Sequence, residues 1–280
     1  MKYKIDHDIH IHSYISPCAG HDPRQTAEAI LAYGIASGFH LVCVTDHVWD
    51  KDGPGECTLW RGKGLDFDKA KEILPLPQSP KCSFIFGIEA DLDSDGNLAV
   101  TEKDYDTFDF IIVSPSHMHI FPPKFDEDCG TPVAEIYKEE YKRRLNQIFG
   151  MNLPFEKCGL AHFTTSLACK KDPDGIFDAF SDEEYEEIFG KVAELGMGVE
   201  INLDKKYLTA DEETFLHHLR PYRIAKKMGC TFYLGGDCHT PDKFDICAPL
   251  FRRVTEALDL TEDDKMPLVK KYTKKLQNVD

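Results

Sequence analysis

The sequence has no run of eighteen or more apolar residues, so we expect no transmembrane helix and no membrane partner. Residues 1–7 contain no apolar h-region, and we therefore expect no cleaved signal peptide. The ten cysteines form no Cys-x-x-Cys pair, so a structural zinc knuckle is not indicated. Reduced thiols in such a chain predict a cytoplasmic protein.

Positive charge is also scarce in this chain. There are 33 Lys and Arg residues against 49 Asp and Glu residues, which gives a formal net charge of −16. Duplex nucleic acid requires the opposite balance, because affinity for it comes from neutralising phosphates, so no nucleic-acid partner is expected. A small phosphorylated metabolite can still bind if metal cations supply positive charge locally. The sequence leaves the oligomeric state open.

Short apolar runs alternate with helical patterns, which is typical of a parallel α/β fold. No linker or internal repeat interrupts them, so we expect one domain over residues 1–280. Seven strands are predicted, at residues 5–10, 41–45, 83–88, 110–114, 159–162, 198–201 and 231–234. The clearest helices are predicted at residues 26–37, 132–149, 182–195 and 211–228.

Residues that can bind metals gather where the predicted strands end. They follow six of the seven strands: His10 and His12, Asp46 and His47, Glu89 and Asp91, His117, His162, and Asp237 with His239. In a parallel barrel every carboxyl strand end points to the same rim, so these side chains should converge there. Carboxylates in a buried mouth are costly without cations. Together the residues predict a metal centre, although none of them would indicate one alone.

The same residues lie in a set of short motifs: His10-x-His12, Thr45-Asp46-His47, Gly87-Ile88-Glu89, Ser114-Pro115-Ser116-His117, Ala161-His162 and Gly236-Asp237-Cys238-His239. Over nearly the whole chain this set resembles the PHP (polymerase and histidinol phosphatase) superfamily, and its histidinol phosphatases in particular. The resemblance implies a distorted (β/α)7 TIM-like barrel, in agreement with the seven predicted strands. It also implies a metal-dependent phosphoesterase.

A trinuclear site with two to three divalent ions (Zn, Fe or Mn) follows from the same resemblance. The first metal would be held by His10, His12, Glu89 and Asp237. Glu89 would bridge to a second metal, which His117 and His162 would also hold. His47 and His239 would hold the third metal, together with one residue from the loop after the first strand.

That loop departs from the family pattern. Family histidinol phosphatases carry a compact Cys-Gly-His stretch there, whereas this chain has the longer Ser16-Pro17-Cys18-Ala19-Gly20-His21. Both His21 and Cys18 are therefore candidates for the third metal. We predict His21, because an imidazole matches the other two ligands and Gly20 lets the loop turn inward.

Substrate contacts are predicted on the same rim. Asn202 ends the sixth strand, and the resemblance makes it a residue that faces the site. A phosphomonoester dianion should also need a Lys or Arg beyond the metals. Lys205 and Lys206 are the first candidates because they follow Asn202, Arg61 is the second, and Lys124 is a further one.

The chemistry follows from the cluster. A water that bridges two divalent metals becomes a hydroxide-like nucleophile near neutral pH. The leaving oxygen needs a proton, which Asp237 or a histidine of the third metal, such as His239, could donate. Asp8 and Asp46 flank ligands and are expected to orient imidazoles. The predicted reaction is hydrolysis of a small phosphomonoester, with histidinol phosphate as the leading candidate.

Three other functions stay open at this point. An amidohydrolase also has a His-x-His first strand, but typically holds two metals and has no bridge of the Glu89 type. A PHP-type nuclease would share the site, although the acidic composition disfavours it. A non-catalytic metal-binding module would keep the fold without turnover, but no ligand position is plainly degraded.

Overall fold

The computed structural model describes residues 1–55, 65–125 and 130–277. Seven parallel strands form one sheet in the order β1-β2-β3-β4-β5-β6-β7. The strands are β1 (His7–Ile11), β2 (Leu41–Val44), β3 (Ser83–Asp91), β4 (Phe110–Ser114), β5 (Cys158–Leu160), β6 (Gly198–Ile201) and β7 (Thr231–Leu234). The predicted parallel α/β fold is thereby confirmed, and three strands begin and end as predicted.

The first and last strands meet at their carboxyl ends. Ile11 pairs with Cys238 in an isolated parallel bridge, the His12 amide donates to the Cys238 carbonyl at 3.1 Å, and the Asp237 amide donates to the His10 carbonyl at 2.8 Å. This contact nearly closes the sheet into a barrel. It also joins the two chain segments that carry four of the predicted metal ligands.

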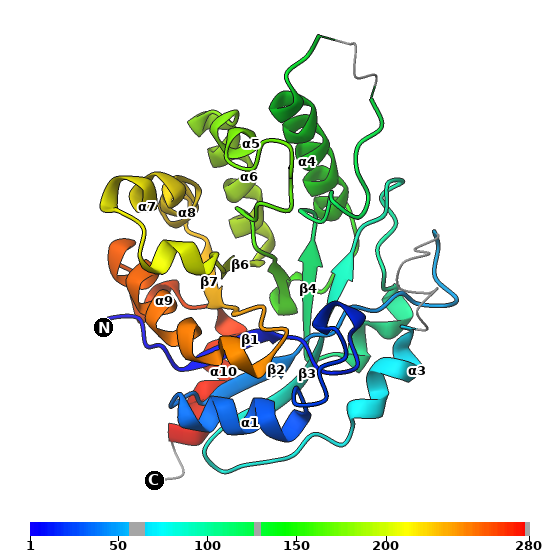
Figure 1. Ribbon diagram of the computed structural model, residues 1–280, viewed down its shortest axis with the longest axis vertical. Coiled ribbons are helices and arrows are strands. Elements are labelled where there is room, and N and C mark those ends of the chain that lie inside the picture. The colour runs from blue at the N-terminus through cyan, green and yellow to red at the C-terminus, as the bar shows by residue number, and fades with distance from the viewer. Residues whose placement is uncertain (56–64, 126–129, 278–280) are drawn as a thin grey trace.

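Helices surround the strands (Figure 1). The α-helices are α1 (Ala27–Ala36), α3 (Phe67–Ala70), α4 (Val133–Phe149), α5 (Gly175–Asp178), α6 (Asp182–Leu195), α7 (Glu212–His218), α8 (Arg220–Lys227), α9 (Phe244–Ala257) and α10 (Pro267–Gln277). The 3-10 helices are η1 (Pro17–Ala19), η2 (Lys71–Ile73), η3 (Glu102–Thr107), η4 (Phe155–Lys157), η5 (Lys205–Leu208), η6 (Pro241–Lys243) and η7 (Glu262–Asp264). In the part of the chain described, no helix is both long and apolar enough to cross a membrane.

Local sequence signals explain several helix ends. The capping box of Ser181 and Glu184 opens α6, and Gly196 ends it in the left-handed conformation, as expected for a residue without a Cβ. The single helix predicted at residues 211–228 is wrong, because the structure has α7 and α8 with a break at Leu219. Pro221 lies at the start of α8, where its missing N–H costs nothing, but in a continuous helix it would remove a hydrogen bond.

Two apolar layers hold the barrel together. The outer layer packs between the strands and the helices, and alternate strand residues face the inside. The inner cluster consists of Ile9, Leu41, Cys43, Ile85, Phe110, Ile112, Ala161 and Tyr233, together with Met266 and Val269. Met266 and Val269 close the end of the barrel at which the strands begin. The opposite end is therefore the one left for polar side chains.

A buried ion pair ties η7 to the first strand, and we expect its loss to destabilise the fold. The Lys265 ammonium is fully buried, donates to both Asp6 oxygens at 2.9 and 3.0 Å, and lies 2.8 Å from Glu262. Lys265→Met would leave the Asp6 carboxylate buried without its cation, which should lower the free energy of unfolding by about 3 kcal/mol. Denaturant unfolding of Lys265→Met measures this loss of stability. The control is Lys191→Met, which breaks an exposed ion pair with Glu194. Equal midpoints for the two variants would contradict the prediction.

Candidate metal centre

Eight of the nine predicted metal ligands converge at the carboxyl end of the barrel. They come from β1, β3 and the segments that follow β1, β2, β4, β5 and β7: His10, His12, His47, Glu89, His117, His162, Asp237 and His239. His21 is the exception and is exposed. The side chains of Asp237 and His239 are 30% and 24% exposed, whereas those of His10 and Glu89 are 0% and 1% exposed. Asp237 and His239 therefore form the accessible side of the cluster.

The strands aim these residues inward through local geometry. The β1 register shifts between Asp8 and Ile11, and such a bulge re-aims the side chains that follow it. On β3, Glu89 lies in the same alternating phase as Ile85 of the inner cluster. Gly87 lies between them, and a Cβ there would be 2.6 Å from the Phe110 carbonyl oxygen. Only glycine fits at this position, so β3 can pass close to β4 and place Glu89 at the mouth.

Four ligand atoms form the tightest group. The Nε2 atoms of His10 and His12 lie 3.2 Å apart, and each lies 3.2 Å from Oε2 of Glu89. Oδ1 of Asp237 is 3.0 Å from His12 and 3.5 Å from His10. Four ligands about 2.1 Å from one tetrahedral ion are separated by about 3.4 Å. The observed spacing fits a single divalent ion.

The other oxygen of Glu89 faces a second group. Oε1 of Glu89 lies 2.9 Å from Nε2 of His162 and 3.6 Å from Nε2 of His117. The two imidazole rings stack with centroids 4.7 Å apart. Glu89 therefore presents one oxygen to each group, which is the geometry expected of a bridging carboxylate.

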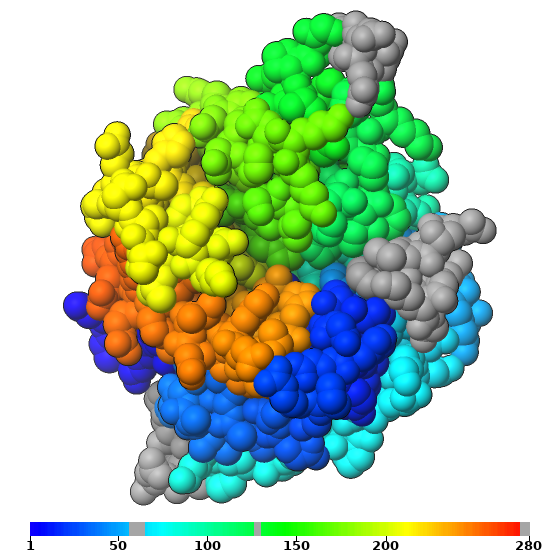
Figure 2. Space-filling view, in the orientation of Figure 1, coloured from blue at the N-terminus to red at the C-terminus, as the bar shows by residue number. Residues whose placement is uncertain are grey.

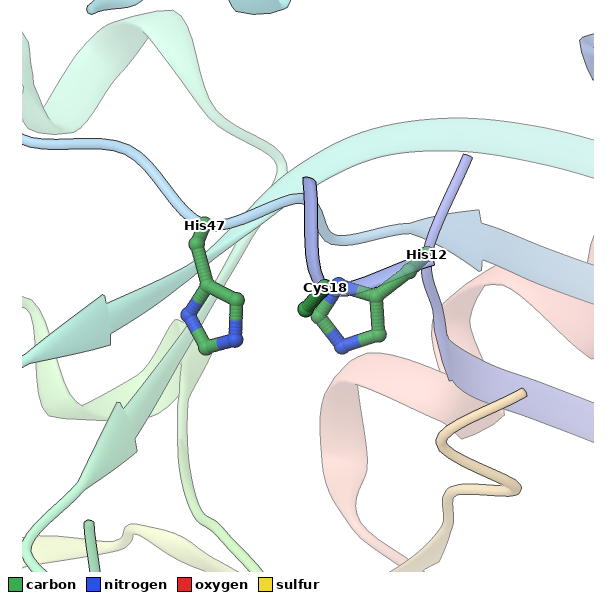
Figure 3. A group of neighbouring side chains, drawn as sticks. All are labelled: His12, Cys18 and His47. Carbon is green, nitrogen blue, oxygen red and sulfur yellow. Dashed lines mark hydrogen bonds between the residues drawn. The ribbon is translucent and has the colours of Figure 1, made fainter. Parts of the chain in front are cut away.

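A third group contains Cys18 and not His21. Figure 3 shows His12, Cys18 and His47 gathered together, and Sγ of Cys18 lies 3.7 Å from Nδ1 of His12. The nearby imidazoles of His12, His239 and His47 lower the pKa of the Cys18 thiol to about 3, although burial opposes this. His21 instead donates from Nδ1 to the Tyr14 carbonyl at 3.1 Å. The structure thus does not bring the predicted His21 to the cluster.

The reason lies in the backbone of the loop. Residues 17–19 form η1, which turns Cys18 toward the cluster, and Gly20 ends it at a φ of +61°. His21 follows at a φ of +52°, a left-handed conformation that is uncommon outside glycine. The turn at Gly20 was predicted to direct His21 inward, but in the structure it directs His21 away from the cluster.

Two buried carboxylates that the sequence did not single out for this role orient the imidazoles. Asp91 accepts from Nδ1 of His117 at 2.5 Å and pairs with Nδ1 of His47 at 3.0 Å, and Glu200 accepts from Nδ1 of His10 at 2.6 Å. Each contact leaves the Nε2 atom to face Glu89, which is how ligand histidines are usually fixed. A carboxylate in the interior phase of an apolar strand is the signal that could have revealed Glu200.

Asp8 and Asp46 do not have the predicted role of orienting imidazoles. Asp8 accepts from the Gly236 amide at 2.9 Å and from the Tyr33 hydroxyl at 2.8 Å, so it ties β1 to β7 and α1. Asp46 accepts from the amide and hydroxyl of Ser13 at 2.7 and 2.5 Å, while its nearest imidazole atom, on His12, is 3.9 Å away. Both carboxylates therefore stabilise backbone segments.

The electrostatics of the cluster also fit a cation. Burial alone would lower the pKa of His10, but Glu200, Glu89 and Asp237 raise it well above its usual value. Burial favours a neutral Glu89, yet His47, His10 and His117 hold its pKa well below the usual range. The carboxylates thus stay charged and need positive charge beside them. Divalent ions can supply it in place of the imidazole protons.

A cavity of about 470 Å³ adjoins the accessible side of the cluster. Asp237 and His239 line it together with the predicted substrate residues Asn202, Lys205 and Lys206. Lys124 is exposed in the loop after β4 and does not line this cavity. Arg61 lies outside the described residues.

Comparison with known proteins establishes the fold class. The sequence matches no family model and no curated protein. The chain nevertheless forms the seven-stranded α/β barrel that the resemblance predicted, and solved structures share this fold.

Two solved structures with this fold are histidinol phosphatases by description. One is histidinol phosphate phosphatase from Lactococcus lactis in complex with zinc, L-histidinol and phosphate. It shares 18% identity at a TM-score of 0.50, over 89% of this chain and 93% of its own. The other is a candidate histidinol phosphatase from Listeria monocytogenes, with 13% identity at a TM-score of 0.53, over 85% of this chain and 97% of its own. At these identities the likeness concerns the fold.

Proposed function

We propose that the protein is a metal-dependent phosphoesterase that hydrolyses a small phosphomonoester at a cluster of two to three divalent ions. One observation carries the proposal: the Nε2 atoms of His10 and His12 lie 3.0–3.5 Å from each other, from Oε2 of Glu89 and from Oδ1 of Asp237. The second Glu89 oxygen faces His162 at 2.9 Å. This geometry supports a carboxylate shared between two ions.

The ligands divide into three sets. His10, His12, Glu89 and Asp237 would hold the first ion, and Glu89, His117 and His162 the second. We assign Cys18 to the third ion with His47 and His239, in place of His21. Bound divalent ions would activate water and neutralise phosphate charge. The mixed imidazole and carboxylate ligands suit Zn, Fe and Mn alike.

The accessible residues of the cluster, Asp237 and His239, are the ones that can act on the substrate. Asp237 and His239 face the cavity, so the ester must approach from their side. Nδ1 of His239 donates to the Asp237 carbonyl at 2.8 Å, which leaves Nε2 as the atom that can bind an ion or carry a proton. We propose that one of these two residues, Asp237 or His239, gives the leaving oxygen its proton.

Histidinol phosphate is the first substrate to test, because the Lactococcus structure holds L-histidinol and phosphate. Protein purified without chelator should contain more than one divalent ion per chain by elemental analysis. It should hydrolyse a chromogenic phosphomonoester, lose the activity on treatment with chelator, and regain it with Zn, Mn or Fe. An amide substrate run in parallel tests the amidohydrolase alternative. Metal-loaded protein that hydrolyses the amide and no phosphomonoester would contradict the proposal.

A further inference from the structure

The cavity beside the cluster has walls from three strand ends. Thr164 to Leu167 follow β5, Asn202 to Tyr207 follow β6, and Gly236, Asp237 and His239 follow β7. Lys243 and Ile246, from η6 and α9, also line the cavity, as do Pro173, Asp174 and His218. These segments meet on the face shown in Figure 2, where the green, yellow and orange parts of the chain adjoin. A volume of about 470 Å³ is in the range of small-molecule sites.

One wall residue has an unused hydrogen-bond donor. Nδ2 of Asn202 is buried and has no hydrogen-bond partner among the described residues. The segment itself is held in place, since the Asn202 carbonyl accepts from the Tyr222 hydroxyl at 3.3 Å. A buried donor without a partner costs about 1–3 kcal/mol. A ligand acceptor in the cavity would remove that cost.

Outside the metal cluster, the residues that line the cavity carry a net positive charge, although the chain as a whole is strongly acidic. Lys205, Lys206 and Lys243 line the cavity, and none of the three forms an ion pair with the residues described. Besides Asp237 of the cluster, two carboxylates line the cavity and oppose the lysines, Asp174 and Asp204. Asp204 is already engaged, because it accepts from the Lys206 amide at 2.8 Å.

His218, the lining histidine outside the cluster, adds no charge. Burial, helped by Lys206, lowers the pKa of His218 to about 4, so it is neutral near pH 7. Its two ring nitrogens bond the Tyr207 hydroxyl and the Thr164 hydroxyl, both at 2.8 Å. This network makes a stable polar wall. Outside the cluster, the three lysines therefore outnumber the two aspartates among the residues that line the cavity.

We propose that this cavity selects phosphomonoesters whose organic part carries a second anionic group, a carboxylate or a second phosphate. The inference rests on the proposed phosphoesterase activity, in which metal ions meet the charge of the scissile phosphate. The lysines then face the organic part of the substrate, where Asn202 donates a hydrogen bond. An ammonium group there, as in an amino-alcohol ester such as histidinol phosphate, would meet repulsion from the lysines, with the exposed Asp174 as the available counter-charge.

A matched series of substrates tests this. Propyl phosphates that differ only at the far carbon would carry a carboxylate, a second phosphate, a hydroxyl or an ammonium group. At low ionic strength we expect kcat/KM of metal-loaded protein for an anionic ester to exceed that for the ammonium ester at least tenfold. The preference should shrink with added salt, because exposed charges are screened. Comparison of kcat/KM for the two anionic esters shows whether the cavity prefers a carboxylate or a second phosphate.

Variants separate the roles of the lysines. In the triple variant Lys205→Gln, Lys206→Gln, Lys243→Gln, the ratio of kcat/KM for the anionic ester to the hydroxyl ester should fall at least fivefold. Asn202→Ala should lower the same ratio, and the exposed Lys81→Gln, away from the cavity, is the control. An equal fall for every ester would show that the lysines hold the scissile phosphate, and preference for the ammonium ester would show recognition by Asp174. Either result overturns the inference.

Binding measurements distinguish failure of the proposed phosphoesterase activity from failure of the charge selection. If metal-loaded protein hydrolyses none of the four esters, calorimetric binding of the same compounds still tests the cavity. Tighter binding of the anionic compounds, lost in the triple variant, would support the charge selection without the phosphoesterase. Equal affinity for all four compounds would overturn it.

Discussion

Glu89→Gln should abolish most of the activity and lower the metal content by more than one ion per chain. Oε2 of Glu89 lies 3.2 Å from His10, His12 and His47, and Oε1 lies 2.9 Å from His162. An amide keeps the size of the side chain but loses its charge and one acceptor oxygen. Several kcal/mol of transition-state stabilisation by the ions would be lost, which corresponds to a fall in kcat of about 10³-fold.

Elemental analysis and steady-state kinetics on the same preparation measure the two effects. Glu156→Gln, which makes the same chemical change on the exposed surface, serves as the control and should keep full activity. Unfolding curves check that both variants are folded. A Glu89→Gln protein with full metal content and kcat within tenfold of the parent would show that Glu89 does not bridge two ions.

Cys18→Ser should remove about one ion per chain while leaving the other ions in place. Sγ of Cys18 lies within reach of His12, His47 and His239, whereas the His21 imidazole is exposed and bonded to Tyr14. A hydroxyl is a much poorer ligand than a thiolate, so affinity at this position should fall at least about tenfold. His21→Ala is the matched control and should keep its full metal content.

Cobalt substitution provides a readout other than activity. Protein loaded with Co²⁺ should show near-ultraviolet absorption from thiolate-to-cobalt charge transfer, and Cys18→Ser should lose it. If Cys18 only orients His12, the absorption would be missing in the parent as well. If His21→Ala loses an ion and Cys18→Ser does not, the sequence-based choice of His21 would be right and the loop placement wrong.

The sequence was a good guide wherever a periodic pattern decided the structure. The strands at residues 110–114, 198–201 and 231–234 and the helix at 182–195 have the predicted ends, because apolar runs, a capping box and glycines mark them. The sequence was a poorer guide where a residue type unfavourable to an element lay within that element's pattern. The predicted helix at 211–228 is interrupted at Leu219, just before Pro221. The predicted β3 was three residues too short, because polar Glu89 and Asp91 hid the end of a strand that is buried to Asp91.

The sequence by itself determined the barrel and the convergence of eight of the nine predicted ligands. Strand order and direction follow from alternating strands and helices, and parallel strands bring their carboxyl ends to one rim whatever the loops do. Only the tertiary structure decided which atoms face one another. Cys18 replaces His21 because of a left-handed turn, and Asp91 and Glu200 orient imidazoles from strands far apart in sequence. Such contacts depend on loop torsions and on neighbouring strands, and the local pattern of residues contains neither.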